Sequence, residues 1–529
     1  MRLNSTVLKN DIVLNSKLTL ADAKLVIEGA VKIALHPEAI ERCQKSHARL
    51  NDVIAEERHV YGLTTGFGPL ANRLVDNASG AILQQNLVHH LASGVGPHFD
   101  WASGRAMVLA RLMSILQGAS GASEQAIDAL VGVLNSALSP CVPSQGTVGA
   151  SGDLTPLAHM VLCLQGRGGF CDRHGKVRDG LDALKELGLK PVDLSRRDGL
   201  ALVNGTSAMT GIAVLNADLA ERAIAWSIAL TAAMAETQQA RTEAWHPAFA
   251  QLRPHPRQAD AARQLCDRLV GSNHVIRDHL AARRLTNVGH VTEERAGQDA
   301  YTLRCAPQVI GAVWDTLDWH NNVVTTELNS VTDNPIFPPC QGEELLVLHG
   351  GNFMGQHVGL ASDALANAVC VLAGLAERQI ARMTDETLNR GLPAFLHAGK
   401  AGLNSGLMGA QVTATALLAE MRTTGAASVQ SISTNGANQD VVSMGTIAAR
   451  LLQSKLRTLF QIQAILCLSV AQAVDIMVSN SSEMGFSEST ILLRRFIRDL
   501  SPTITEDRPL GRDIEALASA LAVDAPPSA

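Results

Sequence analysis

The fold class follows from a segment in the C-terminal half of the chain, Ala364-Leu-Ala-Asn-Ala-Val-Cys-Val-Leu-Ala-Gly-Leu-Ala376, which is apolar on nearly all faces of a helix. A helix that faces solvent needs a polar side, so other parts of the protein must cover this one. The stretch from Phe460 to Val474 has the same character. Both are too short, or too often interrupted by Gln and Asn, for membrane spans. They therefore predict a bundle of long helices with a buried centre.

Helical patterns continue through most of the chain after residue 80. The longest cover residues 83–118, 206–250, 300–330, 357–391 and 441–478, and Gly-rich loops lie at 61–72, 166–180 and 349–356. The first 18 residues show weak alternation of apolar and polar residues, and Thr19-Leu-Ala-Asp22 resembles a capping box that opens the first helix. We expect a mainly α protein. Residues 1–200 would form an N-terminal domain, and residues 201–529 a central long-helix bundle with a short C-terminal tail.

Composition indicates a large enzyme-sized chain without a nucleic-acid or membrane partner. The 529 residues are 46% hydrophobic, and 44 Lys+Arg against 50 Asp+Glu give a net charge of −6, which offers nothing to nucleic acid or anionic membranes. The nine cysteines are never closer than eight residues, so no Cys-x-x-Cys metal or redox pair exists and no metal site is predicted. No signal peptide is visible, and the thiols indicate a reduced, cytoplasmic protein.

One Gly-rich stretch, Gly146-Thr-Val-Gly-Ala-Ser-Gly-Asp-Leu-Thr-Pro156, contains three residues that can become an electrophile without an external cofactor. The unhindered nitrogen of Gly152 can attack the Ala150 carbonyl, and loss of water from Ser151 then leaves an exocyclic methylidene. The resulting methylidene-imidazolone is an electron sink that ordinary side chains do not provide. The stretch matches neither a phosphate loop nor a nucleophile elbow. Taken alone, such a tripeptide is more often a turn before a helix.

Tyrosine is nearly absent, and both copies lie in segments suited to catalysis. Tyr61 opens a Gly-rich loop, and Tyr301 stands three residues before Arg304. A phenol can act as a general base where nearby cations or helix N-termini stabilise its phenolate. The alternative is that both tyrosines are amphipathic packing residues.

Seven motifs in one order resemble the aromatic amino acid and histidine ammonia-lyase family. They are Tyr61-Gly-Leu-Thr-Thr-Gly-Phe-Gly68, Gly149-Ala-Ser-Gly-Asp-Leu-Thr-Pro-Leu-Ala-His159, Asn204-Gly-Thr206, Gln298-Asp-Ala-Tyr-Thr-Leu-Arg304, Asn329-Ser-Val-Thr-Asp-Asn-Pro335, His349-Gly-Gly-Asn-Phe353 and Asn438-Gln-Asp440. The match runs from about residue 10 to about residue 515. The resemblance implies an ammonia-lyase/fumarase-like architecture, a long-helix bundle with Gly-rich active-site loops. It also implies a homotetramer with active sites shared between subunits.

The resemblance implies a role for each residue around the electrophile. Ala150-Ser151-Gly152 resembles the precursor of the methylidene-imidazolone (MIO) prosthetic group, so no external cofactor is expected. Asn204 matches the asparagine whose amide holds the developing enolate. Tyr61 resembles the base that removes the β-proton, in a loop suited to a lid, and Tyr301 resembles its partner near the ring. Phe353 resembles the aromatic residue packed beside the prosthetic group. The loop of Tyr61 and the tripeptide both belong to the predicted N-terminal domain.

The substrate's carboxylate and amine also have implied partners. Arg304 matches the arginine that grips the carboxylate with a planar fork of donors. Its offset from Tyr301 places both on one helix face. Asn334, Asn435 and Gln439 match the polar residues that complete the cradle. Asn435 and Gln439 would point to the same place if their segment is helical.

Substrate choice is predicted from Asn86-Leu-Val-His-His-Leu-Ala-Ser-Gly94. Phenylalanine-preferring relatives usually have Phe at the position of His90, whereas tyrosine-preferring bacterial relatives have His followed by Leu, as in His90-Leu91. An imidazole can exchange a hydrogen bond with a substrate phenol. The alternative is a His pair satisfied by local backbone. Histidine fits less well as substrate, because the aligned His of that branch falls at Leu91 and a Glu usually stands at the position of Gln439.

The resemblance thus implies an ammonia-lyase that converts L-tyrosine to trans-p-coumarate and ammonia. Three alternatives share the prosthetic group: a phenylalanine or dual Phe/Tyr ammonia-lyase, a histidine ammonia-lyase, and an aminomutase, which adds ammonia back at the β-carbon. A fourth alternative is a non-catalytic helical assembly that binds aromatic metabolites. The intact tripeptide and both tyrosines argue against the fourth.

Overall fold

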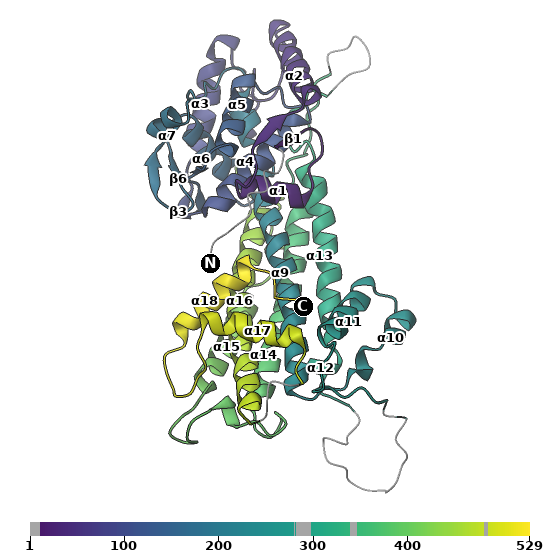
Figure 1. Cartoon of the computed structure of the whole chain (residues 1–529). Helices are drawn as coiled ribbons and strands as arrows, with labels where there is room; N and C mark the ends of the chain where they lie inside the picture. Colours follow the sequence, from purple (N-terminus) through teal and green to yellow (C-terminus); the bar gives the residue numbers. More distant parts are fainter. Residues whose placement is uncertain (1–10, 280, 282–297, 339–345, 481–484, 529) are drawn as a thin grey trace. The chain divides into compact units, whose positions relative to one another are not determined.

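The computed structural model describes residues 11–279, 281, 298–338, 346–480 and 485–528 (Figure 1). The chain is mostly helical and divides into two compact units, each built from non-consecutive segments. Unit 1 comprises residues 1–217, 320–363 and 426–450, and unit 2 comprises residues 218–319, 364–425 and 451–529. Most unit boundaries fall inside long helices. The predicted domain boundary after residue 200 falls inside a short helix of unit 1, Asp198–Val203.

Unit 1 contains the short strands and most of the short helices. Its helices are α1 (Leu20–Ile27), α2 (Pro37–Ala55), η1 (Gly68–Leu70), η2 (Asn77–Ser79), α3 (Gly80–Leu91), α4 (Trp101–Leu116), α5 (Glu124–Leu134), α6 (Leu154–Leu164), α7 (Gly180–Glu186) and α8 (Asp198–Val203). Its strands are β1 (Ile12–Leu14), β2 (Ile33–Leu35), β3 (Val95–His98), β4 (Ser139–Pro140), β5 (Pro143–Gln145), β6 (Gly169–Cys171) and β7 (Val177–Asp179). β1 pairs with β2 in parallel, β3 with β5 antiparallel, and β4, β6 and β7 form an antiparallel sheet.

Four long helices contribute residues to both units, and the remaining helices belong to unit 2. The long helices are α9 (Ser207–Thr237), α13 (Ala306–Leu328), α14 (Gln356–Thr384) and α16 (Gly445–Asn480). The unit 2 helices are η3 (Thr242–Trp245), α10 (Pro247–Leu252), α11 (Pro256–Arg268), α12 (Tyr301–Arg304), η5 (Ala394–Leu396), α15 (Met408–Thr423), α17 (Glu488–Leu500) and α18 (Gly511–Val523).

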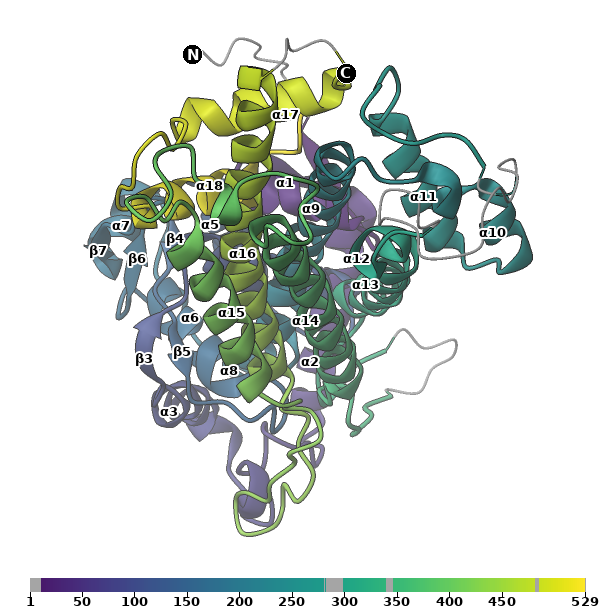
Figure 2. The ribbon, with the colours of Figure 1, turned by 90° about the horizontal axis from the view of Figure 1, so that it is seen from below.

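Each unit has a hydrophobic core of its own. In unit 2, α9, α14 and α16 lie as neighbours (Figure 2), and buried glutamines join them. Gln379 of α14 donates to the Thr231 hydroxyl of α9 at 2.9 Å, and Gln463 of α16 donates to the Ala223 carbonyl at 2.7 Å. Such paired amides allow polar side chains in an otherwise apolar bundle.

Several predicted helices are correct, and others are interrupted. Thr19 caps α1 by accepting from the Asp22 amide at 3.1 Å, as the capping box predicts. The predicted helix 83–118 is wrong as one element, because Gly96 adopts a positive φ and the chain forms β3 between α3 and α4. The predicted helix 206–250 ends at Thr237, just before Gln239 with φ 47°. The predicted helix 300–330 is α12 followed by α13.

The two apolar segments were predicted to be too short, or too often interrupted by Gln and Asn, for membrane spans. This prediction is wrong, because the helices that contain them are longer than the segments. Gln356–Thr384 and Gly445–Ser479 are both long and apolar enough by length and composition alone. Of their most apolar stretches, 61% and 72% of the residues are buried inside the structure. The core helix of a soluble protein meets the same criterion, so burial in the bundle accounts for their composition.

Candidate active site

The tripeptide Ala150-Ser151-Gly152 forms a tight turn directly before α6. Ser151 and Gly152 both have left-handed backbone conformations, with φ of 54° and 75°. Gly152 pairs with Gly205, and the Asp153 amide donates to the Gly205 carbonyl at 2.8 Å. A Cβ on Gly152 would lie 2.2 Å from the Gly205 carbonyl oxygen, so only glycine fits this position.

Two side-chain amides converge on Ser151. Nδ2 of Asn204 donates to the Ser151 carbonyl oxygen at 3.3 Å. Nε2 of Gln439 donates to the Ser151 hydroxyl at 3.2 Å. Asn204 is 4% exposed, and its buried Oδ1 has no hydrogen-bond partner among the residues that the structure describes. These contacts bring together three residues that the sequence predicted as one site.

The geometry fits the MIO group that the tripeptide is predicted to form. If Gly152 nitrogen closes a ring onto Ala150, the Ser151 carbonyl becomes the carbonyl of that ring. Asn204 already directs a neutral amide donor at this oxygen, where negative charge would develop. The strained backbone at Ser151 and the glycine required at position 152 suit a cyclisation that needs an unhindered nitrogen.

Asp153, the next residue, ties the turn to two long helices. Its Oδ2 accepts from the Met209 amide at 2.8 Å in the first turn of α9, and the Thr446 hydroxyl of α16 donates to its Oδ1. The carboxyl is fully buried, and this desolvation raises its pKa to about 6. Asp153 therefore fixes where α6 begins relative to α9 and α16 within unit 1.

Asn435 and Gln439 meet in a turn and not in a helix. The backbone of Thr434 pairs with Gln439, and Asn435 has a φ of 50°. Nδ2 of Asn435 donates to Oε1 of Gln439 at 2.6 Å. The helical spacing considered from the sequence is thus wrong, but the two side chains still point to one place because the turn closes them together.

Tyr61 lies in a tightly folded loop between α2 and η1. The Gly68 amide donates to its phenol oxygen at 2.9 Å, and the Tyr61 amide donates to Nε2 of His349 at 3.2 Å. A donor at the phenol oxygen stabilises the phenolate form that a general base needs. Desolvation, with help from His59 and Arg197, lowers the pKa of His349 and so keeps its ring a neutral acceptor.

The loop of His349 also reaches Asn334. The Gly350 amide donates to Oδ1 of Asn334 at 2.7 Å, and Asn352 donates to the Val331 carbonyl at 3.1 Å. Phe353 is half-buried in the same loop. The His349-to-Phe353 loop therefore connects the predicted base, Tyr61, with the predicted cradle residue, Asn334.

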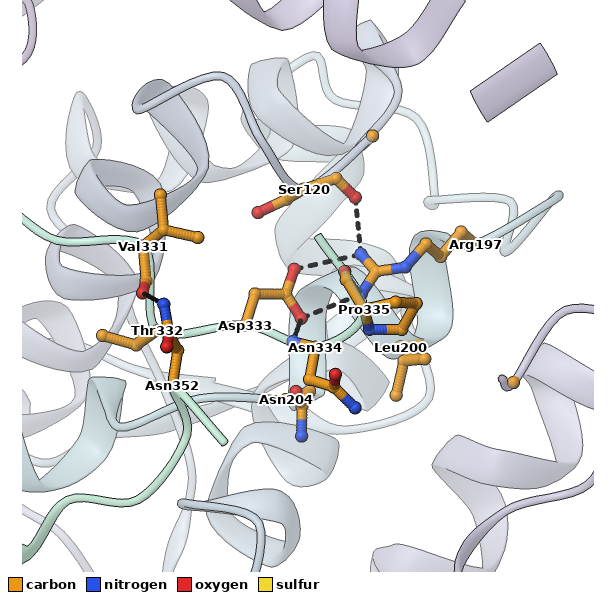
Figure 3. A network of polar contacts seen from close by, with 12 residues as sticks. Ser120, Arg197, Leu200, Asn204, Val331, Thr332, Asp333, Asn334, Pro335 and Asn352 are labelled. Atoms are coloured by element: carbon orange, nitrogen blue, oxygen red, sulfur yellow. Dashed lines mark hydrogen bonds and ion pairs between the residues drawn. The ribbon is translucent and has the colours of Figure 1, made fainter. Parts of the chain in front are cut away.

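A fully buried ion pair supports Asn334 from behind (Figure 3). Arg197 binds both oxygens of Asp333, at 3.0 and 2.9 Å, and neither side chain has exposed surface. Arg197 also donates to the Pro335 carbonyl at 2.8 Å, and Asp333 accepts from the Asn334 amide at 2.7 Å. A bidentate pair of this kind holds the backbone on both sides of Asn334 in place.

His90 is exposed near the end of α3, and among the described residues only its Nδ1 has a hydrogen-bond partner. Its Nδ1 lies 2.9 Å from the Asn86 carbonyl, which can only accept, so Nδ1 carries the hydrogen and Nε2 is an acceptor. His89 uses its Nε2 to accept from Arg167 at 2.8 Å. The alternative, in which the local backbone satisfies the histidine, is therefore correct for Nδ1 of His90 only. Its Nε2 remains available to a ligand. Leu91 is half-buried beside it.

Tyr301 and Arg304 belong to unit 2, whereas all other predicted site residues belong to unit 1. The Arg304 guanidinium lies 4.8 Å from the centre of the Tyr301 ring, as their predicted common helix face requires. Nη1 of Arg304 donates to Gln298 at 2.6 Å. Tyr301 is 70% exposed, an unusual position for a packing residue.

A family model for aromatic amino acid lyases matches residues 18–498. The chain belongs to this family. It is 60% identical over 518 residues to a tyrosine ammonia-lyase of Cereibacter sphaeroides, covering 98% of both chains. It is also 38% identical to a MIO-dependent tyrosine 2,3-aminomutase of Streptomyces globisporus, covering 95% of this chain and 93% of the relative. A solved structure of tyrosine aminomutase from that organism matches with a TM-score of 0.90 at 36% identity, covering 97% of both chains.

Three supporting residues of this lyase were not predicted from the sequence as parts of the site. His349 and Asp153 stand inside motifs that the family resemblance uses, but no role was predicted for either of them. Arg111 lies in the apolar run Met107-Val-Leu-Ala-Arg-Leu-Met113, where a charged residue is itself a signal of a buried polar partner. Its partner, the Asn204 carbonyl, is 93 residues away and could not be read from spacing.

Proposed function

We propose that this lyase eliminates ammonia from L-tyrosine to give trans-p-coumarate, using MIO formed from Ala150-Ser151-Gly152. The observation that carries the proposal is the convergence of Asn204 and Gln439 on Ser151. Each contact places a neutral donor on a group that takes part in MIO formation. Asn204 donates to the Ser151 carbonyl, which becomes the ring carbonyl, and Gln439 donates to the Ser151 hydroxyl, which is lost as water. The identity to the tyrosine ammonia-lyase of Cereibacter sphaeroides supports the same reaction.

The prosthetic group, when formed, supplies an electrophile that accepts electron density from the substrate and makes the amine a better leaving group. Asn204 holds the oxygen on which negative charge would develop, and its burial keeps water from competing for that hydrogen bond. Gln439 and Asn435 orient each other at the substrate side of the turn.

Tyr61 takes the β-proton in this proposal. Its phenol oxygen already accepts from the Gly68 amide, so the loop holds this oxygen in a fixed position for the proton transfer. The loop that bears Tyr61 rests on His349, so the position of the base depends on the neutral imidazole. Asn334, held by Gly350, offers its amide to the substrate cradle.

Arg304 binds the substrate carboxylate, and we infer that it reaches the site from a neighbouring copy in a homotetramer. Tyr301 and Arg304 support one another in unit 2 while the other site residues cluster in unit 1. The exposure of Tyr301 is explained if another subunit covers it. We also propose a cytoplasmic location, with which the eight free cysteines of the described residues agree.

His90 selects tyrosine through the acceptor at Nε2. A substrate phenol can donate to this nitrogen, whereas the phenyl ring of phenylalanine leaves it unsatisfied. Sites that satisfy a hydroxyl discriminate more strongly than sites that only fit apolar volume. Leu91 lines the ring beside it.

The second candidate is an aminomutase acting on tyrosine. The relative of Streptomyces globisporus carries that name and shares the fold at a TM-score of 0.90. An aminomutase needs the same base, electrophile and carboxylate arginine, so the residues described above do not separate the two outcomes. Only the fate of the released ammonia distinguishes them.

Incubation of the purified protein with L-tyrosine, L-phenylalanine and L-histidine in separate reactions tests the proposal. We expect near-UV absorbance of trans-p-coumarate from tyrosine, slower formation of cinnamate, and no urocanate. Chromatography of the tyrosine reaction for β-tyrosine decides between lyase and aminomutase. Substantial β-tyrosine as the main early product would replace the lyase assignment, and preferred deamination of histidine would refute the role of His90.

A further inference from the structure

Arg111, in the C-terminal half of α4, is a fully buried arginine that contacts the backbone of Asn204. Its Nη1 donates to the Asn204 carbonyl, and its Nη2 donates to the Ser114 hydroxyl at 2.8 Å. The side chain has no exposed surface, and its Nε has no hydrogen-bond partner in the described part of the chain. Burial of a guanidinium costs free energy unless new hydrogen bonds replace those that it loses to water.

No carboxylate of the described residues forms an ion pair with Arg111. The nearby carboxylate of Asp333 gives both oxygens to Arg197 (Figure 3). Burial lowers the pKa of Arg111 to about 10, which leaves it charged at neutral pH. The position of Arg111 is therefore set by two neutral acceptors, the Asn204 carbonyl and the Ser114 hydroxyl.

The Asn204-Gly205 turn is held between Arg111 and the tripeptide. A Cβ on Gly205 would lie 2.5 Å from Nη1 of Arg111. The Gly205 carbonyl accepts from the Asp153 amide at 2.8 Å, and Gly205 pairs with Gly152. The backbone of Asn204 thus has a guanidinium on one side, while its side chain reaches the Ser151 carbonyl on the other.

Ser114 is part of the same support. Its hydroxyl lies 3.3 Å from the Thr332 hydroxyl and accepts from the Thr332 amide at 3.1 Å. Thr332 lies directly before Asp333 in the segment of Figure 3. The Ser114 hydroxyl therefore orients the Arg111 guanidinium, and the buried Thr332 in turn holds the Ser114 hydroxyl in place.

We propose that Arg111 is a positioning residue that sets the Asn204 amide against the Ser151 carbonyl, with Ser114 orienting its guanidinium. This inference rests on the proposed function, because the Ser151 carbonyl matters as the ring carbonyl of MIO. Loss of the two Arg111 hydrogen bonds would let Asn204 move away from the Ser151 carbonyl oxygen, on which charge develops. The result is slower turnover at unchanged substrate affinity, since Arg111 contacts none of the residues proposed to bind the substrate carboxylate.

The helix that carries Arg111 also supplies matched controls. Arg105 is equally buried but donates only to backbone carbonyls, such as Ile27 at 2.7 Å and Leu134 at 2.7 Å. Ser103 is a fully buried serine whose hydroxyl has no hydrogen-bond partner within the described ranges. The test pairs are Arg111→Lys with Arg105→Lys, and Ser114→Ala with Ser103→Ala.

Three measurements are made on each variant: the mass of the peptide spanning residues 146–156, kcat and KM for L-tyrosine, and Tm. The peptide mass gives the fraction of chains that have lost two waters, and kcat is divided by that fraction. We expect Arg111→Lys to lower this corrected kcat by about 10-fold or more and Ser114→Ala by about 3- to 10-fold, with KM within about 3-fold. Arg105→Lys should lower Tm because it loses hydrogen bonds to backbone carbonyls, and Ser103→Ala should leave Tm nearly unchanged because its hydroxyl has no partner to lose. Both should keep corrected kcat within about 2-fold.

Wild-type corrected kcat in both Arg111→Lys and Ser114→Ala would overturn the inference, and so would equal losses in the control variants. If Arg111→Lys does not fold, Ser114→Ala against Ser103→Ala decides by itself. An incompletely dehydrated peptide in Arg111→Lys, with a complete one in Arg105→Lys, would show that the Asn204-Gly205 turn also holds Gly152 for ring closure, and the corrected kcat still decides the inference. A wild-type protein that lacks the mass loss or does not act on tyrosine refutes the proposed function instead.

Discussion

The side-chain amide of Gln439 donates to the hydroxyl of Ser151 at 3.2 Å, across 288 positions of the chain. The contact shows why unit 1 needs its returning segment 426–450, which carries Gln439 to the turn before α6. An amide can donate to the serine hydroxyl and accept from Asn435 at the same time. A carboxylate at position 439 could only accept, which separates this chain from the pattern expected of the histidine branch.

Ser151→Ala should fold and assemble as the wild type does and lose nearly all activity. Alanine has no hydroxyl to eliminate, so no methylidene can form, while the backbone turn keeps its contacts to Gly205. Mass spectrometry of the peptide spanning residues 146–156 checks this. The wild-type peptide should be lighter than its sequence by two waters, whereas the variant peptide cannot lose the water that comes from the Ser151 hydroxyl. An active wild type with an unmodified peptide would refute the prosthetic group.

Tyr61→Phe should lower kcat by about 10²-fold or more while KM changes little. The ring and its edge-to-face contact with Phe67 remain, and the phenol oxygen is lost together with its hydrogen bond from the Gly68 amide. Steady-state kinetics with L-tyrosine check the prediction. Activity within a few-fold of the wild type would move the role of the base to another residue, and Tyr301→Phe tests whether Tyr301 has it.

Asp153 should make the stability of the protein fall as the pH rises. Its folded-state pKa of about 6 lies above the ordinary value of 3.8, so the folded protein holds the proton more tightly than the unfolded chain. The stabilising contribution is full below about pH 4 and is lost as the pH passes through about 6, with a size of up to about 3 kcal/mol.

Asp153→Asn removes this titration and keeps the shape of the side chain. We expect Tm of the variant to gain on that of the wild type between about pH 4 and about pH 7, measured at several pH values in one buffer series. A constant difference in Tm over that range would show that the buried carboxyl is charged throughout or does not sense unfolding.

The sequence predicts local structure well where one segment determines it and poorly where distant segments meet. The cap at Thr19 and the long helices α14 and α16 follow from short-range patterns. The break before α4 does not, because Gly96 and the pairing of β3 with β5 override the helical pattern.

The candidate site shows the same limit. The family motifs identify Ser151, Asn204 and Gln439, and the structure places them in contact. The role of Arg111 was not predicted, because it depends on a carbonyl far away in the sequence. The charged residue in an apolar run indicates a buried partner, but the residue types do not show which backbone carbonyl that partner is. The turn at 434–439 was compatible with helical spacing, and only its positive φ at Asn435 shows otherwise.

Arg304→Lys should impair both KM and kcat, and tyrosine and phenylalanine should be affected alike. A lysine keeps the charge but cannot bind a carboxylate with two parallel donors, nor can its ammonium donate to Gln298 and bind the substrate with the same geometry. Both substrates carry the same carboxylate, so their kcat/KM values should fall by a common factor. A loss confined to one substrate would show that Arg304 reads the ring end.

His90→Phe should switch the substrate preference. The variant removes the Nε2 acceptor, so bound tyrosine would bury an unpaired hydroxyl at a cost of about 1–3 kcal/mol. The value of kcat/KM for tyrosine should fall by about 10- to 100-fold, while that for phenylalanine holds or rises. His89→Phe is the matched control, because its side chain points about 100° away on the same helix and its Nε2 is already occupied by Arg167. Kinetics with both substrates in the wild type and both variants decide the matter. An unchanged ratio in His90→Phe, or an equal switch in His89→Phe, would remove the physical basis for tyrosine selection and leave the family assignment standing without a substrate.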